Sequence, residues 1–379
     1  MFKKLHLSNF RNYIDARLSL DDKRNIVVLY GENGEGKTNV LEAISTFSET
    51  SGLRKASRED MINKDSVNDF WNVAIETEDA EFSSGYLMGK ESGKRVYKVG
   101  DKRVRNLSEF RDNNYLLWMT YETDRLFASA PSDRREFIDM LCCVKDKSHN
   151  VLVRSYERLT KERLKILKLN LGKPILADTA KWLDIIEAKI ADLGLKIADN
   201  RIIVSRELEK FQLRNGEFPE FKNQMTGSLE KSIIEKEVDF RLESYKSELK
   251  DRRQKDGFAG STTFGPNRSD WKVIHVEKQI AAELCSAGEQ KMLLSGAFLA
   301  FVVRNLKYDE RNLILLLDDV SAHLDSRHRA LIFKYVRSLV AQNLNKISVW
   351  LSGTDKTFFD ELKEDAFFFN VHDNLIERG

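Results

Sequence analysis

The chain contains the sequence Gly31-Glu32-Asn33-Gly34-Glu35-Gly36-Lys37-Thr38, a complete match to the G-x-x-x-x-G-K-[ST] pattern of a phosphate-binding loop. The apolar run 26–30 comes directly before the loop, as expected for a strand that is buried on both faces. Apolar residues at helical spacing follow over 40–47. A strand, a glycine-rich loop and a helix in this order predict an α/β fold built around a nucleotide.

The residue types in this loop suit phosphate binding. Glycine lets backbone N–H groups turn toward the phosphates without a clash of Cβ atoms. Lys37 supplies a positive charge for the β- and γ-phosphates, and the Thr38 hydroxyl is a ligand for Mg²⁺. Glu35 is unusual here, because an acid beside bound phosphates is unfavourable unless its carboxylate points away. We therefore expect ATP and Mg²⁺ as cofactors.

A second part of the predicted site lies near the other end of the chain. The aliphatic run 313–317 leads into Asp318-Asp319, as in a Walker B strand. Asp318 is expected to hold Mg²⁺ through its water shell, and Asp319 to act catalytically by orienting the attacking water. Because Asp reaches less far than Glu, we expect slow hydrolysis. A site divided in this way suggests an ATP-driven clamp.

The stretch 286–290, Ser-Ala-Gly-Glu-Gln, precedes a run typical of a buried helix. A serine hydroxyl, a glycine backbone and a helix N-terminus can together bind an anion. The same stretch also fits an ordinary capping box, with Ser286 followed three residues later by Glu289. Its position upstream of the Walker B strand favours a functional interpretation, and both interpretations can hold at once.

Patterns outside these motifs predict the rest of the fold. Leu5, Leu7 and Phe10 indicate an edge strand near the N-terminus, and 70–104 indicates antiparallel strands punctuated by glycine. A helix is expected to begin after Pro131. These segments would complete a lobe around the nucleotide site.

The middle of the chain, from about 151 to 253, is rich in charge and has helical periodicity. Pro174 and the stretch 215–219 break it into separate helices. It is too interrupted for a long coiled coil, which needs sustained heptads. We expect a compact helical lobe, with 257–270 as the linker that returns the chain to the nucleotide-binding part.

Composition limits the function only weakly. The 379 residues carry 62 Lys and Arg against 60 Asp and Glu, so net charge alone predicts no nucleic-acid partner. No apolar run approaches the roughly 18 residues of a membrane span, and the first residues do not resemble a signal peptide, so we expect a cytoplasmic protein. Cys142, Cys143 and Cys285 lack metal-ligand spacing, and the six His form no metal-type cluster.

Taken together, the motifs resemble those of ABC-type ATPases, and more closely those of the RecF family. The ABC-like order is 31–38, 286–290, Asp318-Asp319 and the D-loop-like 321–325. The stretches that resemble RecF are 7–13, 39–44, 123–127, 133–139, 265–270 and 288–291. The resemblance spans nearly the whole chain, and the short helical insert resembles RecF rather than SMC-type relatives.

The resemblance implies an ABC/SMC-like P-loop ATPase lobe with a mixed sheet, plus an inserted helical lobe. The expected boundaries are 1–145 for the first part of the ATPase lobe, 146–256 for the helical lobe and 257–379 for the second part of the ATPase lobe.

The resemblance also implies a function. ATP would drive a head-to-tail homodimer, in which each signature motif meets the nucleotide of the other subunit. The dimer would bind duplex DNA near gaps, work with RecO and RecR to help load recombinase, and be released by weak ATPase activity.

Roles are carried over by position. The expected nucleotide contacts are Asn33, Gly34, Gly36, Lys37, Thr38, Asn39, Ser286, Gly288 and Asp325. Thr38 and Asp318 would hold the metal, and Glu122 falls where ABC-type ATPases keep their Q-loop residue. The sequence departs from the family pattern at Asn267 and Tyr121, and 352–355 lacks the histidine of a switch region.

Residues that would contact DNA are the least defined. Phosphate neutralisation by Lys and Arg makes binding depend on salt, and the candidates are Arg54, Lys55, Arg134, Arg252 and Arg253. Charge runs on helices are more often solvated faces than binding sites.

Two alternatives remain open at the level of sequence. The chain could be the ATPase subunit of a membrane transporter, with activity independent of DNA. It could also be a scaffold that binds nucleotide without turning it over, in keeping with the short Asp319 side chain. The helical insert and the strand around 9–12 argue against the transporter.

Overall fold

The computed structural model describes residues 2–20, 24–50, 52–88, 93, 95–214, 216–235, 237–319 and 326–379. The chain divides into two compact units, of which the first comprises Met1–Asp124 and Val302–Gly379 and the second Arg125–Phe301. The expected helical lobe, 146–256, falls wholly within the second unit, which begins earlier and ends later along the chain.

A six-stranded mixed sheet forms the centre of the first unit. Its strands, in spatial order, are β15 (Leu375–Arg378), β14 (Ala366–His372), β3 (Ile26–Tyr30), β13 (Ile347–Gly353), β12 (Asn312–Asp318) and β8 (Asn114–Thr120). All neighbouring pairs are parallel except β14 and β15. The predicted buried strands are confirmed, because β3, β12 and β13 are apolar runs with almost no exposed residue.

A second sheet of the first unit is wholly antiparallel. Its spatial order is β2 (Tyr13–Ser19), β1 (Lys4–Phe10), β4 (Phe70–Glu76), β5 (Glu81–Leu87), β6 (Arg95–Val99) and β7 (Lys102–Val104). The antiparallel strands predicted over 70–104 are confirmed. The prediction that β1 is an edge strand is wrong, because β1 pairs with β2 on one side and with β4 on the other.

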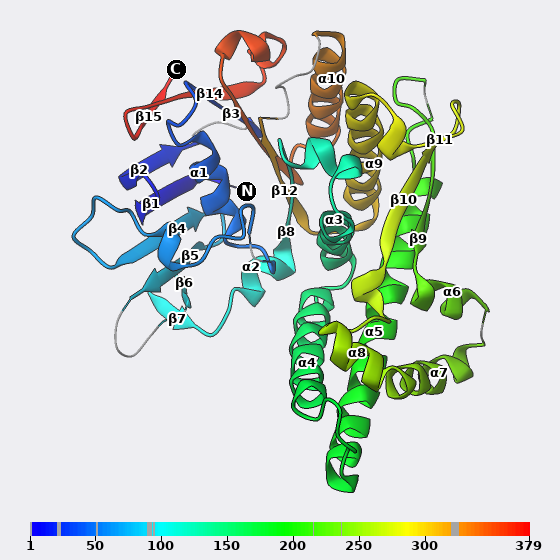
Figure 1. The fold of residues 1–379 in the computed structure, drawn as a ribbon. Coiled ribbons are helices and arrows are strands. Elements are labelled where there is room, and N and C mark those ends of the chain that lie inside the picture. Colours follow the sequence, from blue (N-terminus) through cyan, green and yellow to red (C-terminus); the bar gives the residue numbers. More distant parts are fainter. Residues whose placement is uncertain are drawn as a thin grey trace. The chain divides into compact units, whose positions relative to one another are not determined.

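Helix α1 (Lys37–Ser45) packs against strands of both sheets, as Figure 1 shows beside β1. Its buried residues include Glu42, whose carboxylate accepts hydrogen bonds of 2.8 and 2.7 Å from the Arg11 guanidinium. A buried carboxylate is costly unless paired, so this ion pair ties the residue after β1 to α1. The described part of the first unit also contains the α-helices α2 (Ser108–Asn113) and α10 (Ser326–Gln342).

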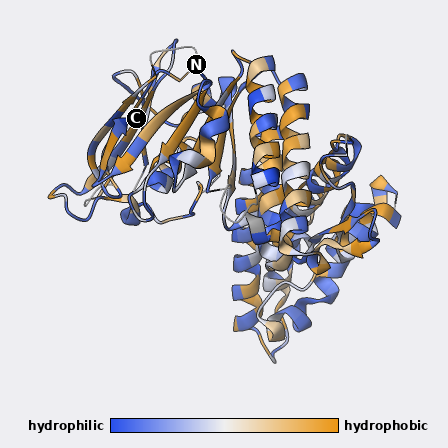
Figure 2. Ribbon diagram, turned by 90° about the horizontal axis from the view of Figure 1, so that it is seen from above, coloured by the Kyte–Doolittle hydropathy of each residue, from blue (hydrophilic) through white to orange (hydrophobic). Residues whose placement is uncertain are grey.

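The second unit is mostly helical. Its helices are α3 (Pro131–Lys145), α4 (His149–Leu169), α5 (Ala177–Lys210), α6 (Ser228–Glu235), α7 (Val238–Asp251), α8 (Arg253–Ala259) and α9 (Ala287–Tyr308), whose last residues belong to the first unit. The predicted helix start after Pro131 is confirmed at α3. Along the long helices, hydrophobic and hydrophilic residues alternate in the pattern of amphipathic helices (Figure 2).

A small sheet interrupts the expected run of helices. Strand β9 (Phe221–Thr226) pairs antiparallel with β10 (Asp270–His275), which also pairs with β11 (Ile280–Ala281). The prediction that 151–253 is entirely helical is therefore wrong at β9. The polar sequence of this strand, with only Phe221 and Met225 buried, gave no alternation strong enough to indicate it.

Charged side chains are buried inside the helical part of the second unit. Arg163 is fully buried and donates to Glu187 at 2.8 Å and to Asp256 at 2.7 Å. Removing one member of such a pair leaves an uncompensated buried charge.

Among the described residues, no helix is long and apolar enough to cross a membrane.

Candidate nucleotide-binding site

The phosphate loop lies between the carboxyl end of β3 and the start of α1, as the sequence predicts. Gly34 and Gly36 have φ angles of 94° and 109°, a left-handed backbone that favours glycine. A Cβ on Gly36 would clash with the Asn12 side chain, and the φ of Gly36 would strain any other residue there. A Cβ on Gly34 would meet no described atom within 4 Å, so this part of the loop borders open space.

Lys37 is buried at the base of the loop. Its Nζ donates hydrogen bonds of 2.7 and 2.6 Å to the carbonyl oxygens of Gly31 and Glu32. Burial lowers the pKa of this ammonium group, and the charges of Asp319, Asp318 and Glu35 oppose the shift. A cation is thus held against the backbone of the phosphate loop.

Thr38 and Asp318, which lie 280 residues apart in the sequence, meet at the carboxyl ends of β3 and β12. The Thr38 hydroxyl donates to Asp318 Oδ1 at 2.9 Å, and the Ser352 hydroxyl donates to the same oxygen at 2.7 Å. Burial raises the pKa of Asp318, while these two hydrogen bonds favour its charged form. A hydroxyl and a carboxylate are the hard oxygen donors that Mg²⁺ prefers.

Asp319 follows directly with a φ of 52°, which turns the chain away from the strand direction. Its backbone N–H donates to Ser352 Oγ at 2.9 Å. Ser352 therefore fixes both acids, although sequence reasoning noted only that its segment lacks a switch histidine. Ser352 comes directly after the predicted buried strand 347–351, and this position was the signal that could have indicated its role. In the structure that strand is β13, which pairs with β12.

The other expected site residues of the first unit are the nucleotide contacts Asn33 and Asn39 and the catalytic candidate Glu122. Asn33 is exposed at the outer part of the loop. Asn39, on α1, donates to Asn12 Oδ1 at 2.7 Å and accepts from Arg54 at 2.7 Å. Glu122 is exposed two residues beyond Thr120, which is the partner of Asp318 in the register of β8 and β12.

The Glu35 carboxylate points toward the turn between β14 and β15. Its Oε2 accepts a hydrogen bond of 2.6 Å from the backbone N–H of Asp373. This contact explains how an acid can stand in the phosphate loop. The sequence could not show it, because the two residues are 338 positions apart.

The signature stretch lies in the second unit and begins α9. The Ser286 hydroxyl and backbone N–H each lie 3.0 Å from Glu289 Oε2, so the predicted capping box is present. Lys278 pairs with the other Glu289 oxygen and, with Ser286, lowers the pKa of Glu289 to about 2. Ser286 and Gly288 are exposed, and the described residues leave open space around Gly288. Asp325 lies outside the described residues.

The five arginines and lysines expected at DNA differ in accessibility. Arg134 is 5% exposed and forms a bidentate pair with Asp270 at 2.7 and 2.9 Å. Arg253 is 8% exposed and binds Glu187 and Asp184. Burial and pairing argue against both as DNA contacts, because each guanidinium is held in ion pairs with acidic side chains below the surface.

The other three remain accessible. Arg54 and Lys55 are exposed in the loop after α1, where Lys55 has a φ of 54°. Arg252 is partly exposed, donates to Glu248 at 2.7 Å and stacks over Phe264.

A buried cluster in the second unit has the residue types of a metal site. Asp139, Cys142 and His149 present ligand atoms within 4.8 Å of one another. Arg201, however, donates to both Asp139 oxygens at 2.7 and 2.8 Å, and Asn200 lies 3.1 Å from His149 Nδ1. A guanidinium already neutralises the carboxylate, so we assign this cluster to a buried hydrogen-bond network.

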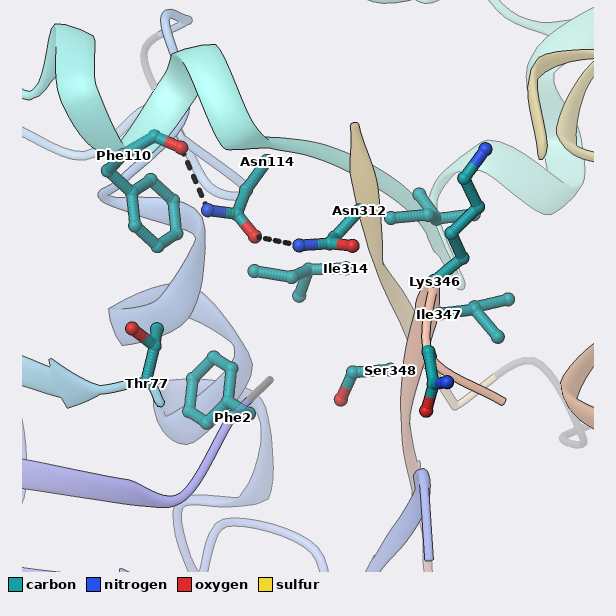
Figure 3. Close-up of a pocket in the computed structure, with 11 residues that line it drawn as sticks. Phe2, Thr77, Phe110, Asn114, Asn312, Ile314, Lys346, Ile347 and Ser348 are labelled. Atoms are coloured by element: carbon teal, nitrogen blue, oxygen red, sulfur yellow. Dashed lines mark hydrogen bonds between the residues drawn. The ribbon is translucent and has the colours of Figure 1, made fainter. Parts of the chain in front are cut away.

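A cavity lies at the amino ends of three strands of the central sheet, opposite the ends that carry the phosphate loop (Figure 3). It is lined by Asn114, Asn312 and Ile347, which begin β8, β12 and β13, and by Phe2 and Phe110. Its internal volume of about 20 Å³ has room for about one water molecule. This cavity is separate from the phosphate loop, which lies at the carboxyl ends of the strands.

Comparisons with known proteins found relatives in sequence and in fold. A family model described as the RecF/RecN/SMC N terminal domain matches residues 1–349. The DNA replication and repair protein RecF of Brucella suis biovar 1 (strain 1330) is 37% identical over 378 residues, covering 97% of this chain and 94% of that protein. RecF of Rhizobium johnstonii is 35% identical over 382 residues, covering 98% and 97%.

A solved structure described as "the recombination mediator protein RecF-ATPrS in RecFOR pathway" has a TM-score of 0.79 at 21% identity. It covers 100% of this chain and 98% of that chain. At this identity the likeness concerns the fold alone. The predicted α/β fold with an ABC/SMC-like P-loop ATPase lobe is confirmed.

Proposed function

The chain belongs to the RecF family of DNA replication and repair proteins, and we propose that it is an ATP-dependent DNA-binding recombination mediator. One observation carries the proposal: the phosphate-loop Thr38 and the buried Asp318, both beside Lys37, meet in a hydrogen-bonded cluster. Such a cluster pairs a cation for phosphates with oxygen ligands for a metal.

Residues of the first unit suit Mg²⁺ and ATP. Thr38 and Asp318 would hold the metal, and Lys37 with the backbone of 33–36 would hold the phosphates. When bound, Mg²⁺-ATP supplies the phosphoryl group whose transfer to water drives the cycle. The glycines fit this role, because the open space beside Gly34 leaves room for phosphate oxygens.

Hydrolysis in this proposal is slow. Asp319 is the acid placed to orient water, since the N–H of Asp319 is fixed by Ser352 and its backbone turns sharply at this point. Its side chain is one methylene shorter than a Glu and reaches less far. The proposed enzyme is therefore a weak ATPase, and ATP hydrolysis dissociates the dimer that ATP binding has stabilised.

The signature stretch supports an ATP-dependent homodimer. Ser286 and Gly288 are exposed at the start of α9, where N–H groups and the helix dipole favour an anion. We assign them to the nucleotide of a second copy, and the resemblance gives Asp325 a D-loop role in the same contact. The capping box holds Ser286 in place, so its cap role and its binding role coexist.

Duplex DNA near gaps is the proposed substrate, with RecO and RecR as partners in loading recombinase in the cytoplasm. Arg54, Lys55 and Arg252 are the phosphate contacts that remain after the removal of Arg134 and Arg253. Membership of the RecF family leaves no support for the transporter alternative.

A titration of gapped duplex DNA with and without ATP, at two salt concentrations, tests the proposal. We expect tighter binding with ATP, and affinity that falls as salt rises, by about 0.9 log units per log unit of salt for each neutralised phosphate. The variant Lys37→Ala serves as the control and should lose the ATP effect. Equal binding with and without ATP would overturn the proposal.

A further inference from the structure

The turn between β14 and β15 contacts the phosphate loop at several points. Asp373 and Asn374 have φ angles of 47° and 63°, and His372 pairs with Leu375 on either side of them. Two left-handed residues between paired strands form a type I′ hairpin turn. In this geometry the Asp373 N–H points at the Glu35 carboxylate, 2.6 Å away.

Asn12 makes a second connection between the same elements. Its amide nitrogen donates to the Glu35 carbonyl oxygen at 3.0 Å and to Asn374 Oδ1 at 2.8 Å. Its amide oxygen accepts from Asn39 at 2.7 Å. One side chain thus links the phosphate loop, the hairpin turn and the first turn of α1.

The first residue of the loop also touches β14. A Cβ on Gly31 would lie 2.2 Å from the Val371 carbonyl oxygen, so the two backbones are in direct contact. The loop is therefore held at its first residue by β14 and at its fifth by the turn that follows.

From these contacts we infer that the β14–β15 hairpin is a clamp that positions the phosphate loop, and that Glu35 is the positioning residue through which it acts. The inference rests on the proposed ATP binding at this loop. A backbone N–H neutralises part of the Glu35 charge and aims the carboxylate away from the loop interior. Glu35 then strengthens nucleotide binding by ordering the loop, although its charge alone would weaken it.

The two effects of Glu35 have opposite signs, so substitutions separate them. If charge repulsion dominates, both Glu35→Gln and Glu35→Ala bind ATP more tightly than the parent chain. If the clamp dominates, Glu35→Gln keeps an acceptor oxygen for Asp373 and binds at least as tightly. Glu35→Ala then loses a hydrogen bond made by a charged group and binds about fivefold more weakly.

The experiment is a titration of the full chain with a fluorescent ATP analogue, at about 0.1 M and about 0.5 M salt. Screening weakens a charge effect at the higher salt but leaves an ordering effect intact. The matched control is Glu377→Gln, which removes a charge from β15 whose partner is His372 and not the loop. We expect its affinity to stay within twofold of the parent.

The outcomes are distinct. Weaker binding by Glu35→Ala at both salts, with rescue in Glu35→Gln, supports the clamp. Equal or tighter binding by Glu35→Ala overturns it. Failure of the parent chain to bind the analogue would instead overturn the proposed function.

Discussion

Ser352→Ala is the substitution that tests the geometry of the site most directly. Ser352 is 1% exposed, and its hydroxyl donates to Asp318 and accepts from the Asp319 N–H. Hydrogen bonds to charged groups contribute about 1.5–3 kcal/mol and neutral ones about 1 kcal/mol. We expect the free energy of unfolding of the first unit to fall by about 3 kcal/mol.

The variant should also change how ATP binding depends on pH. The Ser352 hydrogen bond favours ionised Asp318, so its loss raises the pKa of Asp318 beyond the effect of burial. Mg²⁺ needs the ionised carboxylate, so ATP affinity in the presence of Mg²⁺ should fall as the pH falls. In the variant this loss should begin at a higher pH than in the parent. When the pKa of Asp318 is higher in the folded state than in the unfolded state, the fold loses stability at every pH above the unfolded-state pKa. The difference in free energy of unfolding between the parent and the variant should therefore shrink as the pH falls.

The assay combines urea unfolding with ATP titrations from pH 5 to 8. Ser348→Ala is the control, because Ser348 lies on the same strand, is 6% exposed and accepts a hydrogen bond from Trp350 at 3.1 Å. It should lose about 1 kcal/mol of stability and keep its ATP affinity. If Ser352→Ala matches the parent in unfolding and in its pH profile, the reasoning about Asp318 is refuted.

Three further predictions concern the cycle and the surface. Lys37→Ala should abolish ATP binding. ATP-dependent dimers of that variant in analytical sedimentation would contradict the assignment of the phosphate loop as the ATP site. Asp319→Asn should bind ATP, form dimers and persist on DNA, since only the step that orients water is lost; rapid phosphate release by the variant would remove Asp319 from the mechanism. Arg134→Ala should destabilise the second unit by about 3 kcal/mol, because it removes the bidentate partner of Asp270 and leaves that carboxylate with Lys272 at 3.3 Å. Its DNA affinity, measured at a temperature where the fold persists, should depend on salt as in the parent; a reduced salt slope would restore Arg134 as a phosphate contact.

The sequence predicted the chemical groups of the site better than their arrangement. The phosphate loop and the Walker B strand are local patterns, because each requires its residues within a few positions of one another. Ser352 and the hairpin turn escaped prediction because their roles depend on strand order. Only the placement of β13 and β14 on either side of β3 brings them to the loop.

Long-range pairing also explains the errors at the surface. Arg134 looks like part of an exposed charge run, yet its partner Asp270 lies 136 residues away. Arg253 likewise meets Glu187, which is 66 residues distant. Helical periodicity gives the face on which a side chain lies, but it does not say what covers that face.

The strand order of the central sheet has a consequence for biosynthesis. β3 is completed by residue 30, but both of its neighbours, β13 and β14, follow residue 346. At about 5–20 residues per second, a ribosome needs tens of seconds to supply them. Throughout that interval a fully apolar strand has two unpaired edges, the kind of surface that chaperones recognise. A truncated or stalled chain would therefore expose this strand and lack the nucleotide site altogether, so only a finished chain could respond to ATP.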